Sequence, residues 1–471
     1  MKIFKSLIGG KLLESEKKIN VINPADESVA GEVFFCNENM INSALEAAKN
    51  AFEIYSKMTI LEKEKLIIEF KEKILSNKKT IIDLLISETG KTIDNATYDF
   101  GMLTDCLSFF VEEVKRHYAE TIPDYDNKYF NYLKYSPVGV VGAFLAWNYP
   151  LLNLGYKLGP ILASGNTCVI KPSISTPLAT SFIGELFNEI DFPKGTLNII
   201  ICDGKMGSIV CKSKIPRLLT VIGSTTAGEE LISNSTTSIK RFSLELGGNA
   251  PVIVFKDADI NEAANEIVSL KFNNAGQICV APNRILLHES IHDEFVDKAI
   301  NIAKSYKLGS GYDKGNILSP VISEEALNRI LNVINDAEKN GAKVLYGGKR
   351  ANRKGYFIEP TILINVRPDM DIFKKEIFGP VVAIMKFKDE EDIFNIANNT
   401  DAGLAAYIFT KNINKILEAE ERILSGNILI NGVHYSIQLP HGGLKQSGYG
   451  KDVSHLSLED FFDVKRISIK R

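Results

Sequence analysis

From residue 138 onward, short apolar runs alternate with longer stretches of helical periodicity, and no other feature constrains the fold as strongly. Five strand-like runs cover residues 138–145, 167–170, 197–202, 218–222 and 251–255, and helical stretches separate them. Strands that alternate with helices pair in parallel, because each crossover helix returns the chain to the same end of the sheet. The sequence therefore predicts an α/β fold built around parallel strands.

A second alternating block begins near Asp259 and predicts a second α/β unit. Its expected helices cover residues 260–274, 291–304, 324–339, 390–398 and 414–424, and its expected strands cover 285–287, 343–345, 381–387, 406–409, 427–430 and 464–469. Before residue 138 the chain is expected to be mainly helical, at 41–55, 61–75 and 80–86, and then to form an exposed strand at 129–135.

Charge and cysteine content exclude several classes of protein. Acidic residues number 58 and basic residues 55, so the net charge of −3 does not suit a polycationic nucleic-acid binder. The six scattered cysteines form no CxxC pair, and no HExxH motif or zinc-type Cys/His spacing occurs, so we expect neither a disulfide framework nor a metal site. These features predict a protein of the reducing cytoplasm that binds no nucleic acid.

One uncharged stretch, residues 136–156, is long enough to span a bilayer. It contains Pro137, Pro150, two asparagines and three glycines, which would leave backbone groups unsatisfied in lipid. The N-terminus does not have the pattern of a signal peptide either. We therefore expect no membrane segment, and instead a buried strand, a turn and then a helix.

Four residues that follow expected strands are candidates for binding a nucleotide. Gly223 and Ser224 begin a turn between a strand and a helix, where the helix N-terminus would stabilise a pyrophosphate. Lys171 and Ser173 follow another strand, where a lysine would reach ribose hydroxyls. Taken singly, an ordinary turn and a solvated lysine explain these residues as well.

Four further residues are candidates for chemistry. Cys279 follows an expected helix, where nearby backbone N–H groups would lower its pKa and hold an oxyanion. Burial between two leucines would raise the pKa of Glu245 and suit it to general-base work. Asn148 would point its amide into a site, and Glu376 would accept hydrogen bonds from a ribose. Each also has a structural explanation. Cys279 would be a buried small side chain and Glu245 a paired carboxylate, while Asn148 would form a turn and Glu376 would be a solvated acid.

The order of these motifs carries more information than any one of them. The series WNYP, KPS, GSTTAG, LELGGNAP, AGQIC, KEIFGPV and PHGGLKQSG runs along essentially the whole chain. In this order the motifs resemble the NAD(P)-dependent aldehyde dehydrogenase superfamily. The interval from Glu245 to Cys279, 279 − 245 = 34 residues, is similar to the spacing in that family.

The resemblance implies a role for each candidate. Cys279 would be the nucleophile, Asn148 and the Cys279 N–H would hold the oxyanion, and Glu245 would activate the water that hydrolyses the thioester. The residues implied to bind the cofactor are Leu145, Trp147, Lys171, Ser173, Gly223, Ser224, Leu246, Glu376 and Phe378. The reaction implied is oxidation of an aldehyde to a carboxylic acid through a hemithioacetal and a thioester.

The resemblance also implies three structural parts. Residues 1–120 and 139–246 would form a Rossmann-like cofactor-binding domain, and 247–445 an α/β catalytic domain. Residues 121–138 and 446–471 would form a β arm for oligomerisation. Because exposed strand edges need a partner, a homodimer or homotetramer is expected.

Departures from the family pattern bear on specificity. Members that prefer NAD often carry a glutamate where this chain has Ile174, and the absence of a charge that repels a 2′-phosphate favours NADP slightly over NAD. Related succinate-semialdehyde enzymes carry arginines where this chain has Tyr156 and Asn273, so a substrate carboxylate would lack partners. The C-terminal region, residues 440–460, resembles the aminoaldehyde and betaine-aldehyde branch. We therefore expect a small neutral aldehyde, similar to lactaldehyde or glyceraldehyde, or an amino aldehyde.

Other functions stay open at this point. A succinate-semialdehyde dehydrogenase and a CoA-acylating dehydrogenase would share the fold and the cysteine. A non-catalytic binding protein of the same fold would need neither Cys279 nor Glu245. A cysteine hydrolase would need a histidine base, and the sequence offers no argument that pairs a histidine with Cys279.

Overall fold

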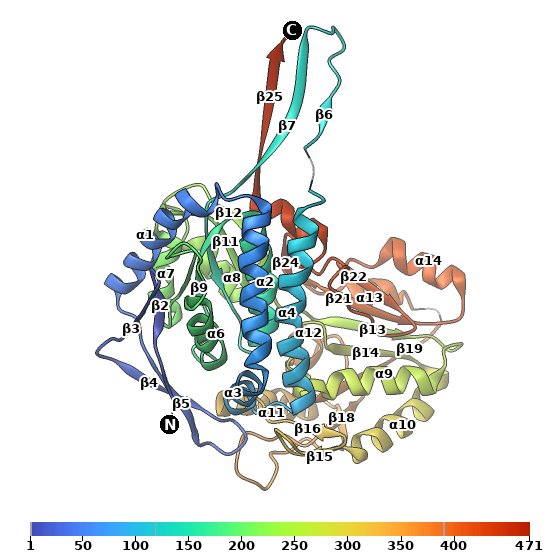
Figure 1. The fold of residues 1–471 in the computed structure, drawn as a ribbon. Helices are drawn as coiled ribbons and strands as arrows, with labels where there is room; N and C mark the ends of the chain where they lie inside the picture. Colours follow the sequence, from blue (N-terminus) through green and yellow to red (C-terminus); the bar gives the residue numbers. More distant parts are fainter. Residues whose placement is uncertain (1, 118, 390) are drawn as a thin grey trace.

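The computed structural model describes residues 2–117, 119–389 and 391–471 and shows a body with two large sheets and a thin projecting arm (Figure 1). The first sheet has five parallel strands at its centre and antiparallel strands added at both edges. Its order is β24 (Gly448–Tyr449), β12 (Arg241–Glu245), β11 (Pro216–Ile222), β8 (Val140–Phe144), β9 (Thr167–Lys171), β10 (Leu197–Ile199), β2 (Ser6–Ile8) and β3 (Lys11–Leu13).

The second sheet is parallel except for one edge strand. Its order is β17 (Lys343–Tyr346), β18 (Thr361–Ile364), β19 (Val381–Phe387), β14 (Pro282–His288), β13 (Ala250–Val254), β21 (Ala405–Phe409) and β22 (Asn427–Ile430). Its central strands read as continuous apolar runs because helices cover both faces.

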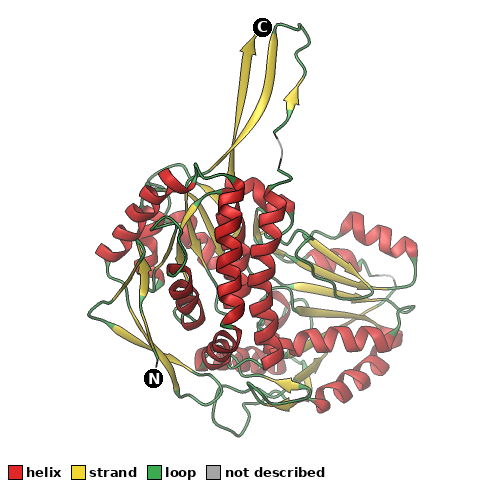
Figure 2. Cartoon of the chain, in the orientation of Figure 1, coloured by secondary structure: helices red, strands yellow, loops and turns green. Residues whose placement is uncertain are grey.

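Helices surround the two sheets (Figure 2). Those around the first sheet are α1 (Glu38–Tyr55), α2 (Ile60–Ser76), α3 (Lys78–Thr89), α4 (Ile93–Val114), α5 (Pro150–Ser164), α6 (Leu178–Asn188), α7 (Gly204–Lys212) and α8 (Thr225–Ser233). Those that follow are α9 (Ile260–Phe272), α10 (His292–Ser305), α11 (Glu324–Lys339), α12 (Asp371–Lys374), α13 (Ile393–Asn398) and α14 (Ile413–Arg422).

Helices α4 and α5 approach each other closely because two glycines of α5 face α4. A Cβ at Gly155 would lie 2.9 Å from the Cα of Leu103, and a Cβ at Gly159 would lie 2.7 Å from the ring of Phe110. This contact positions the middle of α5, the helix that follows the candidate motif around Asn148.

The arm is a three-stranded antiparallel sheet that projects from the body and carries the C-terminus near its tip (Figure 1). It consists of β25 (Phe462–Lys470), β7 (Tyr129–Pro137) and β6 (Thr121–Ile122), in that order. Within the last segment of the chain, only β25 belongs to this sheet, whereas β24 pairs with β12 in the body. The arm exposes apolar side chains, among them Ile122, Tyr125, Phe130, Val464 and Ile469.

Short elements complete the fold. A small sheet near the N-terminus contains β1 (Ile3–Phe4), β5 (Val29–Phe34) and β4 (Lys18–Ile22), and the remaining pairs are β15 (Lys307–Leu308) with β16 (Ile317–Leu318) and β20 (Ala402–Gly403) with β23 (Leu444–Lys445). The 3-10 helices are η1 (Asn273–Gly276), η2 (Glu289–Ile291) and η3 (His455–Phe461).

The predicted α/β class with two parallel sheets is confirmed, and most predicted elements appear within a few residues of their expected bounds. The helix expected at 390–398 begins at Ile393, and residue 390 lies outside the described residues. The strand expected at 197–202 is shorter, at Leu197–Ile199. The long helix α4 was not predicted at all.

The uncharged stretch 136–156 forms the end of β7, then β8 and the start of α5, as the alternative to a membrane segment predicted. Within the described residues, no helix is both long and apolar enough to cross a bilayer.

Candidate active site

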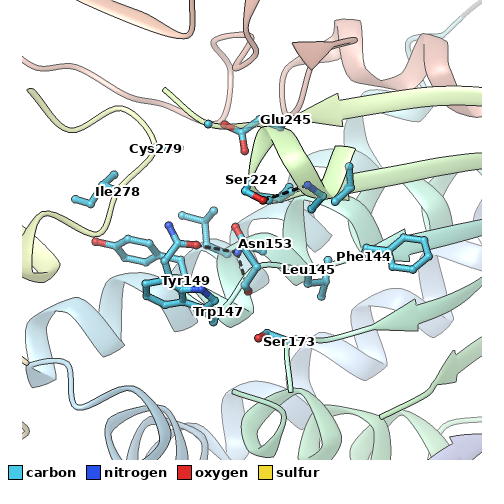
Figure 3. Close-up of a pocket in the computed structure, with 18 of the residues that line it drawn as sticks. Phe144, Leu145, Trp147, Tyr149, Asn153, Ser173, Ser224, Glu245, Ile278 and Cys279 are labelled. Atoms are coloured by element: carbon cyan, nitrogen blue, oxygen red, sulfur yellow. Dashed lines mark hydrogen bonds between the residues drawn. The ribbon is translucent and has the colours of Figure 1, made fainter. Parts of the chain in front are cut away.

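A cavity of about 730 Å³ lies where the carboxyl ends of β8, β9, β11 and β12 face the loop that follows α9. Parallel α/β sheets bind ligands at this edge. Figure 3 shows several of the residues that line the cavity. Among them are the predicted Leu145, Trp147, Asn148, Lys171, Ser173, Gly223, Ser224, Glu245, Cys279, Glu376 and Phe378.

Leu246 is the predicted residue that does not line the cavity. Its side chain is buried, and a Cβ at Gly228 of α8 would lie 2.7 Å from it. Its N–H donates to the carbonyl of Ser447 at 2.9 Å. Leu246 therefore fastens β12 and α8 behind the cavity wall.

The turn between β11 and α8 presents a helix N-terminus to the cavity. Ser224 is the N-cap of α8, and its Oγ accepts a hydrogen bond from the N–H of Ala227 at 3.1 Å. The N–H of Gly223 donates to the carbonyl of Glu245 at 3.0 Å, which holds the ends of β11 and β12 together. The positive end of the helix dipole suits a pyrophosphate at this place.

Lys171 ends β9, and its stem lies against α7. A Cβ at Gly207 would lie 2.8 Å from Cδ of Lys171, so the glycine leaves space for the lysine. Burial lowers the pKa of Lys171. Ile174 lies three residues after Lys171 in the sequence. It is half-buried and packs against an apolar cluster, so no charged side chain occupies this position.

The loop before Cys279 has an unusual backbone. Asn274, Ala275 and Gly276 have φ angles of 48°, 54° and 71°, a left-handed run inside the buried η1. A Cβ at Gly276 would lie 2.2 Å from the carbonyl oxygen of Gly379. A Cβ at Gly248 would lie 2.0 Å from the carbonyl oxygen of Cys279. Strained backbone of this kind persists where the surroundings determine it, which is typical of functional sites.

The electrostatics of Cys279 correct the prediction that backbone donors lower its pKa. Burial raises the pKa of this thiol well above its ordinary value, and the nearby carboxylates of Glu245 and Glu376 raise it further. A backbone hydrogen bond acts in the opposite direction but more weakly. The thiol is therefore protonated at neutral pH and needs a base to become a nucleophile.

His441 is a site residue that the sequence analysis did not assign. Its Nε2 lies 3.1 Å from Oε1 of Glu245 and 4.0 Å from Sγ of Cys279. Burial alone would lower the pKa of His441, but the hydrogen bond and charge of Glu245 outweigh it and the pKa is raised. His441 belongs to the motif PHGGLKQSG, but its partners Glu245 and Cys279 lie 196 and 162 residues away in the sequence, so no local pattern pairs them.

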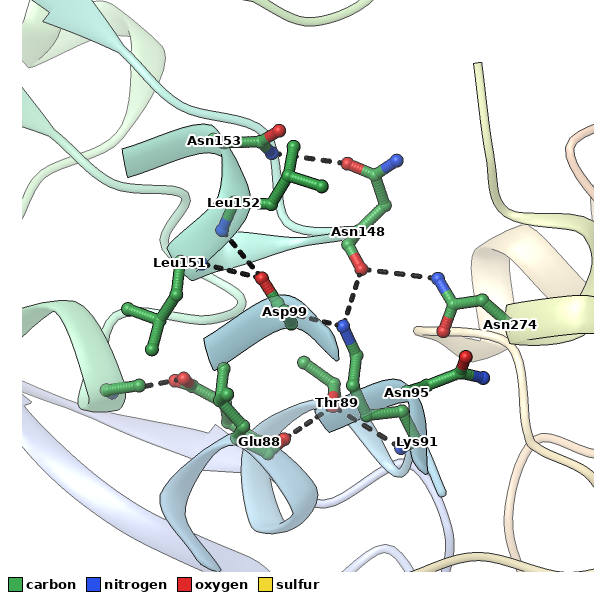
Figure 4. A network of polar contacts seen from close by, with 12 residues as sticks. Glu88, Thr89, Lys91, Asn95, Asp99, Asn148, Leu151, Leu152, Asn153 and Asn274 are labelled. Atoms are coloured by element: carbon green, nitrogen blue, oxygen red, sulfur yellow. Dashed lines mark hydrogen bonds and ion pairs between the residues drawn. The ribbon is translucent and has the colours of Figure 1, made fainter. Parts of the chain in front are cut away.

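Asn148 is held by a buried polar network (Figure 4). Lys91 Nζ donates to the Asn148 carbonyl at 3.0 Å and pairs with Asp99 Oδ2 at 2.7 Å. Oδ1 of Asp99 accepts from the N–H groups of Leu151 and Leu152 in the first turn of α5. One N–H of the Asn148 side chain donates to the carbonyl of Gln277 at 3.1 Å, which leaves the second N–H for a substrate oxygen.

Glu376 and Phe378 approach the site from the second sheet. Oε1 of Glu376 accepts from the N–H of Gly248 at 3.1 Å, and burial raises the pKa of this carboxyl to about 7. The ring of Phe378 meets Trp147 edge-to-face at 5.4 Å. These two residues come from a part of the chain distant from the first sheet, yet both line the same cavity.

The cavity wall near Asn148 and Cys279 is mainly aromatic and apolar, with Tyr98, Tyr149, Leu152, Tyr156, Val433 and Tyr435. Among the described lining residues, the lysine and arginine side chains are Lys171 and Arg329. Lys171 lies at the end of β9, and Arg329 donates to the carbonyl of Glu376 at 3.4 Å. Neither of these two cations belongs to the aromatic part of the cavity wall.

Comparison with known proteins identifies the class of protein that this fold and site define. A sequence model of the aldehyde dehydrogenase family matches residues 12–467. The chain belongs to the aldehyde dehydrogenase family and is an oxidoreductase that acts on aldehydes. The resemblance inferred from the motifs is thereby confirmed.

Individual relatives are similar over nearly the whole chain. A mitochondrial succinate-semialdehyde dehydrogenase of Oryza sativa subsp. japonica is 38% identical, over 98% of this chain and 89% of that protein. The crystal structure of an E. coli NADP-dependent enzyme matches with a TM-score of 0.97 at 32% identity, covering 100% of this chain and 98% of that one. Betaine aldehyde dehydrogenase from Staphylococcus aureus, in complex with NAD+, matches with a TM-score of 0.95 at 33% identity, covering 98% and 94%.

Proposed function

We propose that this enzyme oxidises a small neutral or amino aldehyde to its carboxylic acid, with NADP or NAD as the hydride acceptor. The observation that carries the proposal is that Cys279, Glu245 and Asn148 share one cavity with the N-terminus of α8. A nucleophile, a base and an oxyanion donor thus lie beside a cradle for a dinucleotide. The relatives are named as NADP-dependent in one case and carry NAD+ in another, which supports both cofactors.

In the proposed first half-reaction, Glu245 takes the proton of the Cys279 thiol and passes it to solvent, and the thiolate attacks the aldehyde carbon. The free N–H of the Asn148 side chain and the backbone N–H of Cys279 stabilise the oxyanion. A nicotinamide bound beside Phe378 and Trp147 would accept the hydride, which leaves a thioester on Cys279.

In the second half-reaction, Glu245 takes a proton from water, and the resulting hydroxide attacks the thioester carbon. Collapse of the tetrahedral adduct breaks the C–S bond and releases the carboxylic acid. The hydrogen bond from His441 at 3.1 Å fixes one oxygen of Glu245 and leaves the other for water. A carboxylate in this place supports hydrolysis over transfer to CoA.

The nucleotide preference is proposed from Ile174. An acidic residue at this position would bind ribose hydroxyls and repel a 2′-phosphate, and Ile174 does neither. We therefore propose a slight preference for NADP, with NAD also accepted.

Residues 1–120 and 139–246 are the proposed cofactor-binding domain, and 247–445 the catalytic domain. The proposed oligomerisation arm lies within 121–138 and 446–471 and consists of β6, β7 and β25, since β24 pairs with β12 in the body. We propose a homodimer or homotetramer in the cytoplasm.

The main alternative is a succinate-semialdehyde dehydrogenase, because relatives carry that name. A substrate carboxylate would need a cation near the aromatic wall. Tyr156 and Asn273 line the cavity instead, at the positions where the resemblance places arginines. Burial of an unpaired carboxylate is costly, so we favour neutral and amino aldehydes.

Four-carbon aldehydes that differ only in their terminal group test the substrate class. The series carries a methyl, a hydroxyl, an ammonium or a carboxylate at the end distant from the aldehyde, and kcat/KM is measured with NADP and with NAD. We expect the neutral or ammonium compounds to be better substrates than the carboxylate. A higher kcat/KM for the carboxylate would establish the succinate-semialdehyde alternative.

A further inference from the structure

Three different metal-binding side chains meet beside the catalytic cavity. Glu245, Cys279 and His441 each direct one donor atom to the same place, and these atoms all lie within 4.8 Å of one another. Glu245 comes from the end of β12, Cys279 from the loop after α9, and His441 from the loop after β22. Carboxylate, thiolate and imidazole together are a typical ligand set for Zn²⁺ and unsuited to Mg²⁺ or Ca²⁺.

The distances suit a tetrahedral ion. With zinc–ligand bonds of about 2.0–2.3 Å, donor atoms in a tetrahedral site lie about 3.2–3.6 Å apart. The pair Glu245 Oε1 and His441 Nε2 is 3.1 Å apart, and the pair Cys279 Sγ and His441 Nε2 is 4.0 Å apart. The donor atoms of Cys279 and Glu245 lie within 4.8 Å of each other, so the cysteine side chain must rotate towards both partners for the three donors to share one ion. Glu245, Cys279 and His441 all line the cavity, so a water molecule that completes the shell would come from the cavity side.

The backbones that carry two of these ligands are fixed before any ion arrives. The N–H and carbonyl of His441 form paired hydrogen bonds with Asp452 at 2.9 and 2.6 Å, and Asp452 forms a buried ion pair with Lys157. The Cys279 carbonyl is in contact with Gly248, where no side chain fits. A preformed ligand set loses little conformational entropy when it binds an ion.

We propose that Glu245, Cys279 and His441 form an inhibitory binding site for Zn²⁺ or a similar borderline-soft divalent cation. On binding, the Cys279 thiol releases its proton to solvent, and Nε2 of His441 releases the proton of its hydrogen bond with Glu245 to solvent. The thiolate sulfur, Nε2 of His441 and Oε1 of Glu245 then donate electron pairs to the ion. The ion then occupies the nucleophile and the base together, so both half-reactions stop. Removal of the ion by a chelator restores both groups unchanged.

Cobalt tests the site without relying on catalysis, because Co²⁺ in a tetrahedral thiolate site absorbs in the visible and near ultraviolet. The metal-free enzyme is titrated anaerobically with Co²⁺ in the absence of aldehyde and nucleotide. We expect one ion per chain, a thiolate-to-cobalt band, and displacement by Zn²⁺. Cys279→Ser should lose the band, and His441→Phe and His441→Gln should each weaken binding at least tenfold.

Matched controls separate this site from adventitious binding. Cys211 lines the same cavity but lies outside the cluster, and His434 is exposed on the loop that also carries His441. Cys211→Ser and His434→Gln should bind Co²⁺ as the unaltered enzyme does. Absence of the thiolate band, or equal affinity in folded His441 variants, would overturn the proposal.

Inhibition of aldehyde oxidation by Zn²⁺, reversed by EDTA, is the second readout, and this readout alone rests on the proposed function. If the enzyme binds Co²⁺ with the expected variant pattern but oxidises no aldehyde, the metal site stands and the proposed function fails. If the enzyme oxidises aldehydes at full rate in excess Zn²⁺, the inhibitory site fails and the proposed function stands.

Discussion

Ile174 is the residue from which the nucleotide preference is inferred. Its substitution Ile174→Glu places a carboxylate where a 2′-phosphate would lie, so the variant should lose kcat/KM with NADP by about tenfold or more while retaining activity with NAD. The uncharged Ile174→Gln is the control for size and polarity. The ratio of kcat/KM for the two cofactors is the measurement, and an unchanged ratio in Ile174→Glu would refute the assignment.

Gly248 tests how closely the nucleophile loop is positioned. A Cβ there would lie 2.0 Å from the carbonyl oxygen of Cys279, so Gly248→Ala must displace the loop that carries the thiol. A displacement of about 1 Å costs about 100-fold in rate, and we expect a loss of that size in kcat.

Gly101 provides the matched control for that substitution. It lies in α4, where the described part of the chain places no neighbouring atom within 4 Å of an added Cβ. Gly101→Ala should therefore keep full activity and stabilise the fold by about 0.5–1 kcal/mol. Thermal unfolding of both variants distinguishes a displaced loop from a failure to fold. Normal kcat in Gly248→Ala would show that the loop tolerates the shift.

Most of the residues that the sequence singles out line one cavity in the structure. Cys279, Glu245, Asn148 and the cofactor candidates were found because each sits at a glycine turn or a strand end in the recognised order. The sequence does not predict His441 as a site residue, because its contacts with Glu245 and Cys279 join distant parts of the chain. The raised pKa of Cys279 was also missed, because burial and neighbouring charge follow from tertiary packing.

Among the elements, α3 and α6 are joined by a buried carboxyl group. Glu88 accepts hydrogen bonds from the N–H groups of Leu178 and Ala179, at the start of α6, and burial raises its pKa to about 8. The folded state therefore holds a proton that the unfolded state releases near pH 4.5. The protonated Glu88 carboxyl therefore contributes its full share of the stability below about pH 4.5, and this share is lost as the pH rises towards 8.

Substitution Glu88→Gln removes this titration. The stability of the unaltered enzyme relative to Glu88→Gln should fall between pH 5 and 8, by up to about 1.4 kcal/mol per pH unit, and then level off. Thermal unfolding across this pH range measures the difference. The exposed Glu69→Gln is the control and should show no such trend. A constant difference for Glu88→Gln would contradict the raised pKa.

Helix α4 is a long element that the sequence does not predict. Its buried face mixes Asp99 and Thr104 with apolar residues, so its apolar periodicity is interrupted. Its stability comes from close packing against α5 and from the ion pair of Asp99 with Lys91. By contrast, α11 and β19 were predicted at their observed bounds because their apolar residues follow a regular period.

At the scale of the whole molecule, an exposed arm projects from the body (Figure 1), and the described residues outside the arm do not extend its sheet. Val464 and Ile469 of β25 are 53% and 52% exposed, and β25 is an edge strand. We expect a solution mass of two or four times 52.2 kDa. The double substitution Val464→Lys with Ile469→Lys should shift the mass towards the monomer.

Light scattering after size exclusion measures that mass. Ile413→Lys is the control, because Ile413 is 61% exposed on α14 in the body. This variant should keep the mass of the unaltered enzyme. A single species of 52.2 kDa for the unaltered enzyme would contradict the proposed role of the arm.

The central claim is that Cys279 forms a thioester that Glu245 hydrolyses, and rapid mixing tests it most directly. On mixing Glu245→Gln with aldehyde and cofactor, we predict a burst of one reduced nicotinamide per active site, followed by turnover at least 100-fold slower than normal. Cys279→Ser should give neither burst nor turnover. A normal steady-state rate without a burst in Glu245→Gln, or retained turnover in Cys279→Ser, would contradict the account.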